Sequence, residues 1–432
     1  AAYWGAYTLG WLEDEARGAG RPFAADIYAI SGVSGGSLGA AAFVAALASE
    51  QAALQQGGGH RAASLAGWMG ELLGRDDLSP VVGMALFPDL VARLSPVAIR
   101  RFDRSQALEL TWEQDTRRLA RAAVGVDTPP WFACPLEALH DAPETCPGAK
   151  PAATPVPHLI LNSASARSGR PALQASLDLQ HPSAIGGRNP VFALDGLTLS
   201  GAVHNSARFP YLSPAGRVLG HNGASVDYWV DGGYFENSGV WALQALLHEM
   251  SKAEGFDAGV RARLRFIVFS NDPVHADSGS WLPQPPAPPP SGALAKPVPP
   301  RTLGGGVASQ DRPILLAELF APPEGLFTAR AARADAEVLR LAALLRDDWQ
   351  IEPTAVIRQL QLPATYGRAP SMNWFINHRS TCVMRSMVLA RDECGAKLGG
   401  APAPLPAQIA SAPAYLRYRL QRDALHAEVV GR

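Results

Sequence analysis

The sequence predicts an α/β protein with a mostly parallel central sheet flanked by helices. The first observation is a set of short apolar, β-rich runs at 26–31, 158–163, 226–230 and 263–270. The second is helical periodicity between these runs, at 37–49 and 241–252. Strands that alternate with helices are typical of a sheet covered on both faces. The chain has 432 residues, of which 47% are hydrophobic, so it can bury a large core.

Charge and hydropathy exclude several broad classes. Lys plus Arg is 38 and Asp plus Glu is 39, so no global charge asymmetry indicates a nucleic-acid or anionic-lipid partner. No signal peptide is evident. No apolar run reaches the 18 residues that a membrane span needs, and the best candidate, 37–48, is too short. We expect 37–48 to be a buried helix.

The first 60 residues contain the clearest local pattern. Residues 1–16 read as a helix, with Trp4, Leu9 and Leu12 near one face. The run at 26–31 enters a glycine-rich turn at 32–36, and the small-residue helix follows. We expect 51–60 to be a polar loop.

Prolines and cysteines mark the next region. Residues 61–124 are expected to be mostly helical, with breaks at Pro80, Pro88 and Pro96. Residues 125–157 are rich in proline and are expected to form an irregular surface excursion.

The four cysteines form two pairs, each twelve residues apart, without metal-site spacing: Cys134 and Cys146, and Cys382 and Cys394. Both disulfides and free thiols remain open.

Composition divides the chain into three parts. We expect a domain over 1–280, a Pro/Gly-rich linker or loop over 281–310, and a mainly helical region over 311–432 that packs on the first domain. The middle part holds a dense proline cluster, which is extended where it is ordered.

The strongest chemical signal is Gly32-Val33-Ser34-Gly35-Gly36, a Gly-x-Ser-x-Gly pattern between a predicted strand and a predicted helix. A nucleophile elbow needs this context, because its serine occupies a strained turn and the residues at −2 and +2 must be small. Gly35 and Gly36 also let backbone N–H groups at a helix N-terminus face a developing oxyanion. The pattern predicts that Ser34 is a nucleophile.

A serine hydroxyl needs a base, and Asp231 is the candidate. It ends the strand VDYWV and is followed by Gly232 and Gly233, which permit a tight turn at the carboxyl edge of the sheet. The alternative is a structural turn in which Asp231 caps the next helix.

Together the two motifs resemble the patatin-like phospholipase family, whose members place Gly-x-Ser-x-Gly early and Asp-Gly-Gly or Asp-Gly-Ala late. HLILNSASARSGRP at 158–171, NSARFPYLSPAG at 205–216 and NWFI at 374–377 are also similar to family segments, in the same order. SGVSGGSLGA and VDGGYFENSG look like a bacterial branch. The resemblance covers 1–275 well and the remainder loosely.

The resemblance implies a three-layer patatin-like fold and a lipid acyl hydrolase with a Ser34–Asp231 dyad. No metal or other cofactor is implied. The substrate would be a phospholipid, a lysophospholipid or a neutral acyl ester, with a membrane surface as a further partner and no nucleic acid. Phe209, Tyr211 and Tyr234 are candidates to line the acyl site, although each could equally belong to the core. Localisation stays open between membrane association, which longer members of the bacterial branch show, and the cytoplasm.

One family feature is missing from the sequence. Members carry a Gly-Gly-Gly-x-Arg/Lys-Gly loop upstream of the serine, and it supplies most of the oxyanion hole. The opening AAYWGAYTLGWL resembles the helix that follows this loop, so we expect the loop, with a central strand, just before Ala1. Loss of an oxyanion donor costs about 10²–10³ in rate, so these residues alone are expected to be poorly active and poorly folded.

Two other functions remain open. A patatin-like module without turnover, which binds lipid or a partner protein, would fit the missing loop. A Ser-His-Asp esterase would take Asp231 or Asp272 as its acid and His275 or His378 as its base. His204 and His221 flank the motifs and could line the site. No histidine or carboxylate cluster has metal-ligand spacing.

Overall fold

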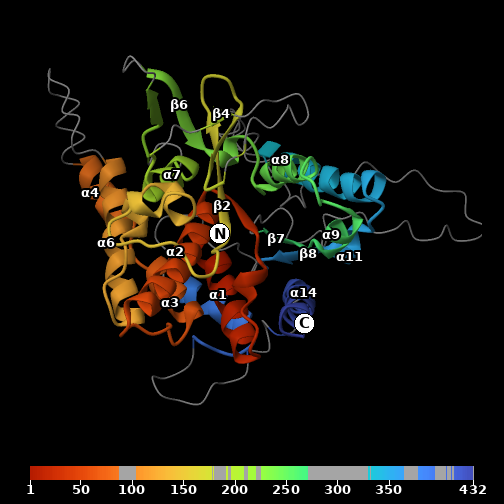
Figure 1. Cartoon of the computed structure of the whole chain (residues 1–432), viewed down its shortest axis with the longest axis horizontal. Helices are drawn as coiled ribbons and strands as arrows, with labels where there is room; N and C mark the ends of the chain where they lie inside the picture. The colour runs from red at the N-terminus through yellow and green to blue at the C-terminus, as the bar shows by residue number, and fades with distance from the viewer. Residues whose placement is uncertain are drawn as a thin grey trace, which may run out of the picture.

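The computed structural model describes residues 1–86, 104–177, 179, 191–192, 196–208, 213–219, 225–270, 329–330, 332–363, 378–394, 405, 410 and 413–431. It is an α/β protein in which helices surround a mixed sheet (Figure 1). The predicted linker at 281–310 lies outside the described residues, as do Pro88, Pro96 and 374–377.

The main sheet has six strands in the order β4-β3-β2-β6-β5, with β1 also paired to β2. The strands are β1 (Ala29–Val33), β2 (His158–Ser165), β3 (Pro171–Ala175), β4 (Val191–Phe192), β5 (Gly216–Leu219) and β6 (Ser225–Asp231). β2 is the central strand, because β1, β3 and β6 all pair with it.

The prediction of a mostly parallel sheet is wrong for these strands. β1 pairs with β2 and β3 with β4 in parallel, whereas β2–β3, β2–β6 and β5–β6 are antiparallel. For the pair β2–β3 the cause is local, because these strands are joined by a tight turn in which Gly169 has a φ of 65°. A connection this short can only join antiparallel strands.

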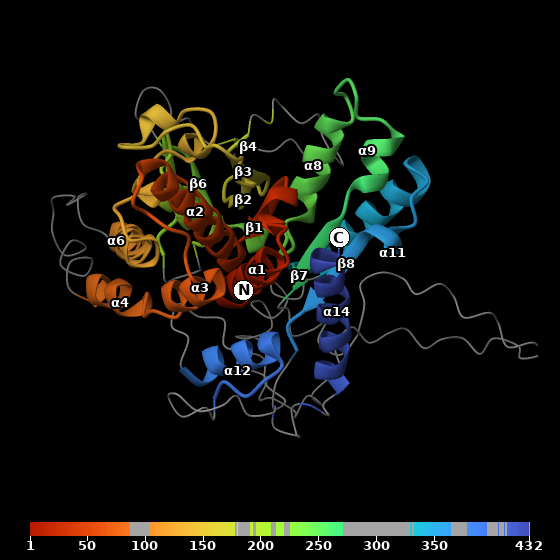
Figure 2. The ribbon, with the colours of Figure 1, turned by 60° about the horizontal axis from the view of Figure 1, so that its bottom comes forward.

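Helices cover both faces of the sheet (Figure 2). Leu159 and Leu161 of β2 face a core built with α2 (Gly35–Gln56), and Ile160 of the same strand faces a second core with α8 (Val240–Met250). Neighbouring residues of a strand point to opposite faces, so the continuous apolar run of β2 is explained by burial on both sides.

The helix predicted at the N-terminus is confirmed as α1 (Ala2–Gly18), in which Trp4, Leu9 and Leu12 are all buried. α1 packs against α2 and against α3 (Leu65–Leu73). Arg17 of α1 bonds both Glu13 and the buried Glu50 of α2, which ties the two helices together.

α2 is longer than the sequence predicted. The expected loop at 51–60 is wrong over its first half, because Gln and Ala favour a helix and the chain stays helical to Gln56. Gly57, with a φ of 69°, ends it. Among the described helices, α2 alone is long and apolar enough to cross a membrane, but 89% of its apolar window is buried inside the protein. The buried core helix of a folded domain can have the same length and apolar composition as a membrane span.

Further helices follow at α4 (Leu78–Leu86) and α6 (Arg104–Val124). The break predicted at Pro80 is wrong, since Pro80 lies in the first turn of α4, where a missing N–H costs no hydrogen bond. The segment after α6 is irregular, as predicted, with three short 3-10 helices: η2 (Trp131–Ala133), η3 (Leu136–Leu139) and η4 (Pro143–Thr145).

The surface excursion predicted for 125–157 is wrong for the earlier part of the segment, whereas 147–155 is mostly exposed, as predicted. Trp131, Phe132 and Leu136 are buried in the main core, because large apolar side chains outweigh the proline-rich composition. The disulfide Cys134–Cys146 closes the segment, and a second disulfide joins Cys382 to Cys394. The question that the sequence left open is thus answered in favour of two disulfides.

The C-terminal region contributes a strand as well as the expected helices. β8 (Ile357–Gln361) pairs in parallel with β7 (Phe266–Ser270) in a separate two-stranded sheet. α9 (Ala258–Arg263) comes directly before β7, and the described helices of the C-terminal region are 332–343, which continues into a π-helical turn at Leu344–Asp348, α11 (Pro353–Val356), α12 (His378–Leu389) and α14 (Pro413–Val430).

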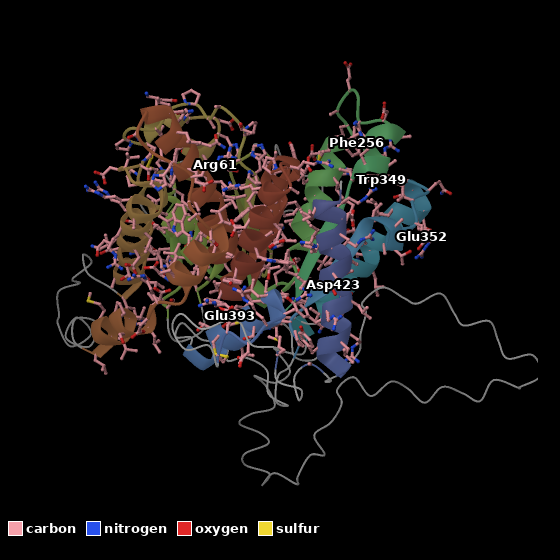
Figure 3. The ribbon with its side chains drawn as sticks, turned by 90° about the horizontal axis from the view of Figure 1, so that it is seen from below. Arg61, Phe256, Trp349, Glu352, Glu393 and Asp423 are labelled. Atoms are coloured by element: carbon pink, nitrogen blue, oxygen red, sulfur yellow. A yellow bond between two sulfur atoms is a disulfide. The ribbon has the colours of Figure 1, made fainter. Side chains whose placement is uncertain are left out.

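α14 lies beside β8 and runs along α1, with Tyr418 near Trp4 and His426 stacked on Trp11 (Figures 1 and 2). Phe256 and Trp349 form an edge-to-face pair with ring centres 5.6 Å apart, which joins the start of α9 to the turn after residue 348 (Figure 3). Described residues after 328 therefore pack against described residues before 271.

Candidate active site

Ser34 occupies a sharp turn between β1 and α2. Its φ is 53° and its ψ is −126°, a strained backbone conformation for a residue other than glycine. A Cβ atom at Gly32 would lie 2.6 Å from the Ser37 Cα, so only glycine fits two residues before the serine. Strain at the serine and a required glycine at −2 are the geometry of a nucleophile elbow.

The glycine two residues after Ser34 has a different explanation from the predicted one. A Cβ atom at Gly36 would meet no atom within 4 Å, so the turn itself does not require a small residue there. Gly35 and Gly36 instead form the first turn of α2 and line a cavity. N–H groups in the first turn of a helix have no acceptor within the helix, so these two can face a ligand.

The pairing of the central strand brings the two motifs together. β1 and β6 pair with the same edge of β2. The last pair of β1 is Val33–Asn162, and the last residue of β6, Asp231, pairs with the next β2 residue, Ser163. β1 and β6 therefore point at each other, and the residues at their carboxyl ends meet. As a result, the Ser34 Oγ lies 2.6 Å from the Asp231 Oδ2 and donates a hydrogen bond to it.

Both carboxylate oxygens of Asp231 are held. Oδ1 accepts the N–H of Gly233 at 2.8 Å, and Oδ2 accepts the hydroxyl of Ser34. Asp231 therefore caps the following 3-10 helix, η5 (Gly232–Tyr234), and also faces the serine. A Cβ atom at Gly232 would lie 2.1 Å from the carbonyl oxygen of Asn162, so glycine is required beside the aspartate. Asp231 can therefore be both a helix cap and a candidate base: Oδ1 caps η5, and Oδ2 faces the Ser34 hydroxyl.

Burial raises the pKa of Asp231 above its usual value, because the carboxylate is withdrawn from water. The Ser34 hydroxyl, the N–H of Gly233 and the positive charge of Arg330 act in the opposite direction, although burial outweighs them. A carboxyl group with a raised pKa is a better proton acceptor than a surface aspartate.

Arg330 is a residue of the site that sequence reasoning missed. A Cβ atom at Gly233 would lie 3.3 Å from the Arg330 Nη1, so the guanidinium occupies space that this glycine leaves open. Arg330 also lines the cavity beside the dyad. It comes from the C-terminal region, about 100 residues after Asp231, and no motif marks it.

The pH dependence of activity should report this arrangement. The acid limb of kcat/KM is expected above the ordinary Asp value of 3.8, with activity rising as Asp231 loses its proton. Arg330→Gln removes a charge that favours the carboxylate, so the limb should move to higher pH. The pH profile of kcat/KM, measured for wild type and Arg330→Gln, checks this. Arg333→Gln is the control, because Arg333 donates to the backbone carbonyl of Phe235. An unchanged limb in Arg330→Gln would contradict it.

The dyad opens on a cavity of about 490 Å³ between β1 and β7. Among the described strands, β1 pairs only with β2 and β7 only with β8, so the cavity separates two strand edges. Most of its lining is apolar and includes Trp4, Phe23, Leu38, Leu247, Phe266 and Phe269. This composition suits an acyl chain.

The structure places the other predicted residues as follows. Tyr234 lines the cavity, whereas Phe209 and Tyr211 lie outside the described residues. Asp272, His275 and His221 also lie outside them, and His378 begins α12 with its side chain undescribed.

No described histidine lines the cavity. His204 is fully buried, with its ring nitrogens 2.7 Å from the Glu109 Oε1 and 3.1 Å from the Ser213 Oγ. Within the described residues, no group of three or more His, Cys, Asp or Glu side chains could hold a metal ion.

Comparison of the chain with protein-family models and with curated protein sequences finds no match to either.

Proposed function

We propose that this protein is a lipid acyl hydrolase of the patatin-like type that acts through Ser34 and Asp231. One observation carries the proposal: a serine in a strained elbow donates a 2.6 Å hydrogen bond to a buried carboxylate at the wall of an apolar cavity. A structural serine needs neither the strained backbone nor the buried base. The resemblance of the two motifs and of the segments at 158–171 and 205–216 to family segments, in the same order, supports the same function.

The first half-reaction follows from these positions. The Ser34 Oγ attacks the ester carbonyl carbon while its proton passes to the Asp231 Oδ2. The carbonyl oxygen becomes an oxyanion, which the N–H groups of Gly35 and Gly36, in the first turn of α2 and at the cavity wall, would stabilise. The tetrahedral intermediate then expels the alcohol, which takes the proton from Asp231, and an acyl-Ser34 ester remains.

The second half-reaction uses the same groups. A water molecule attacks the acyl-Ser34 carbonyl and gives its proton to Asp231, which returns it to the Ser34 Oγ as the fatty acid leaves. The apolar cavity lining would hold the acyl chain throughout. The two half-reactions need no residue beyond the dyad to move protons.

A covalent probe tests the proposal directly. We expect a fluorophosphonate to label the full native chain and Ser34→Ala to lose both labelling and hydrolysis of a phospholipid or monoacyl ester. Ser31→Ala is the matched control: this nearby serine lies in β1, where its hydroxyl bonds the carbonyl of Gly239. Equal labelling of wild type and Ser34→Ala would overturn the assignment of the nucleophile.

A patatin-like module without turnover is the second candidate, because the apolar lining of the cavity would suit an acyl chain whether or not Ser34 reacts. The same experiment separates the two functions. A folded wild-type protein that remains unlabelled, yet binds fatty acid or lysolipid at the cavity, would establish binding without hydrolysis.

A further inference from the structure

Ser206, the last residue of α7 (Leu199–Ser206), lies behind the elbow with its side chain completely buried. Its Oγ is 3.1 Å from the backbone nitrogen of Ser34, 2.7 Å from the Ser37 Oγ and 2.5 Å from the carbonyl oxygen of Asn162. No step of the proposed reaction uses this hydroxyl.

The directions of the three hydrogen bonds follow from the chemistry of a hydroxyl group, which has one proton to donate and two lone pairs. The Asn162 carbonyl can only accept, so Ser206 donates its single proton there. The Ser34 N–H then donates to Ser206, and the Ser37 hydroxyl must do the same. Every bonding capacity of Ser206 is filled, which fixes the orientation of its side chain.

These bonds meet at the point where β2 changes partner. Asn162 pairs with Val33 at the end of β1, and the next residue pairs with Asp231 at the end of β6. Ser206 therefore links the backbone of Ser34 and the side chain of Ser37, in the first turn of α2, to Asn162 of β2. Asp231 is held independently by the N–H of Gly233.

We propose that Ser206 is the positioning residue of the nucleophile: it holds the backbone N–H of Ser34 and thereby keeps the Ser34 Oγ within reach of Asp231. This inference rests on the proposed hydrolase function. It also excludes the N–H of Ser34 from the oxyanion hole, since Ser206 occupies it. The amides that remain for an oxyanion at this turn are those of Gly35 and Gly36.

The test compares two buried serines of the same helix. Ser200 is also completely buried, and its hydroxyl bonds the carboxylate of Glu113, away from the dyad. Ser206→Ala should lower kcat and the rate of fluorophosphonate labelling by about 10–10²-fold with little change in KM, because misplacement of the nucleophile affects the chemical step. Ser200→Ala should lower thermal stability to a similar degree and leave kcat near the wild-type value.

Ser206→Cys keeps the shape of the side chain and a weaker acceptor, so its labelling rate should fall between those of Ser206→Ala and wild type. It also provides the measurement if Ser206→Ala does not fold. Wild-type rates in folded Ser206→Ala, or equal losses of kcat in Ser200→Ala, would overturn the positioning role. Wild type that is itself unlabelled would instead remove the proposed function and this inference with it.

Discussion

The Asp231→Asn substitution is expected to lower kcat for ester hydrolysis by about 10⁴-fold, the scale of loss when the acidic residue of a catalytic serine system is replaced. An asparagine side chain has the same shape and can still accept the N–H of Gly233 and bond the Ser34 hydroxyl. It cannot take a proton from Ser34. Loss of the base with retention of the geometry should therefore affect turnover far more than folding.

Stability should move little or rise in the same variant. Asp231 is buried, and burial raises its pKa, so the ionised carboxylate carries a desolvation cost that asparagine removes. Circular dichroism and thermal unfolding beside steady-state kinetics check both parts of the expectation.

Glu236→Gln is the matched control for Asp231→Asn. Glu236 is a second buried carboxylate of the same motif whose pKa burial also raises, but it bonds the backbone of Ser238 and Gly239 instead of Ser34. Each Glu236 carboxylate oxygen accepts a backbone N–H, and glutamine has only one acceptor oxygen, so this replacement should reduce stability, with a much smaller loss of kcat. Similar kinetic losses in both variants would show that the Asp231 effect is structural.

The sequence predicts the local parts of the site well because their signals are local. Gly32, Ser34 and the small-residue helix lie within a few residues of one another, and strand-turn-helix geometry follows from that spacing alone. The resemblance to the patatin-like family also implies that Asp231 faces Ser34. The distance between their side chains needs the pairing of β1 and β6 with the same edge of β2, which no local pattern contains.

The features that sequence reasoning missed depend on contacts between distant segments. Arg330 reaches the site because Gly233 leaves space for it. The sequence around either residue gives no sign that the two lie close together. Trp131 and Phe132 enter the core from a segment whose composition indicates a surface loop. The antiparallel pair β2–β3 arises from the tight turn at Gly169, which a count of alternating strands and helices overlooks.

The Gly32→Ala substitution is expected to remove activity and to lower the free energy of unfolding by about 3 kcal/mol, the upper end of the usual cost of overpacking. The added Cβ would lie 2.6 Å from the Cα and 2.7 Å from the nitrogen of Ser37. These are backbone atoms of the first turn of α2, so they cannot rotate away as a side chain would. Relief of the clash requires the elbow itself to open, which separates Ser34 from Asp231.

Gly36→Ala supplies the opposite expectation within the same five residues. A Cβ there meets nothing within 4 Å, and alanine favours a helix over glycine by up to about 1 kcal/mol, so the folded state should be unchanged or more stable. Activity should fall only if the new methyl group obstructs the cavity that Gly36 lines, and such a loss would appear mainly in KM. Thermal unfolding and kinetics of the two variants therefore separate the glycine that the elbow requires from the glycine that leaves room for substrate. If both variants behave alike, the turn at Ser34 is not the constrained elbow on which the proposed mechanism depends.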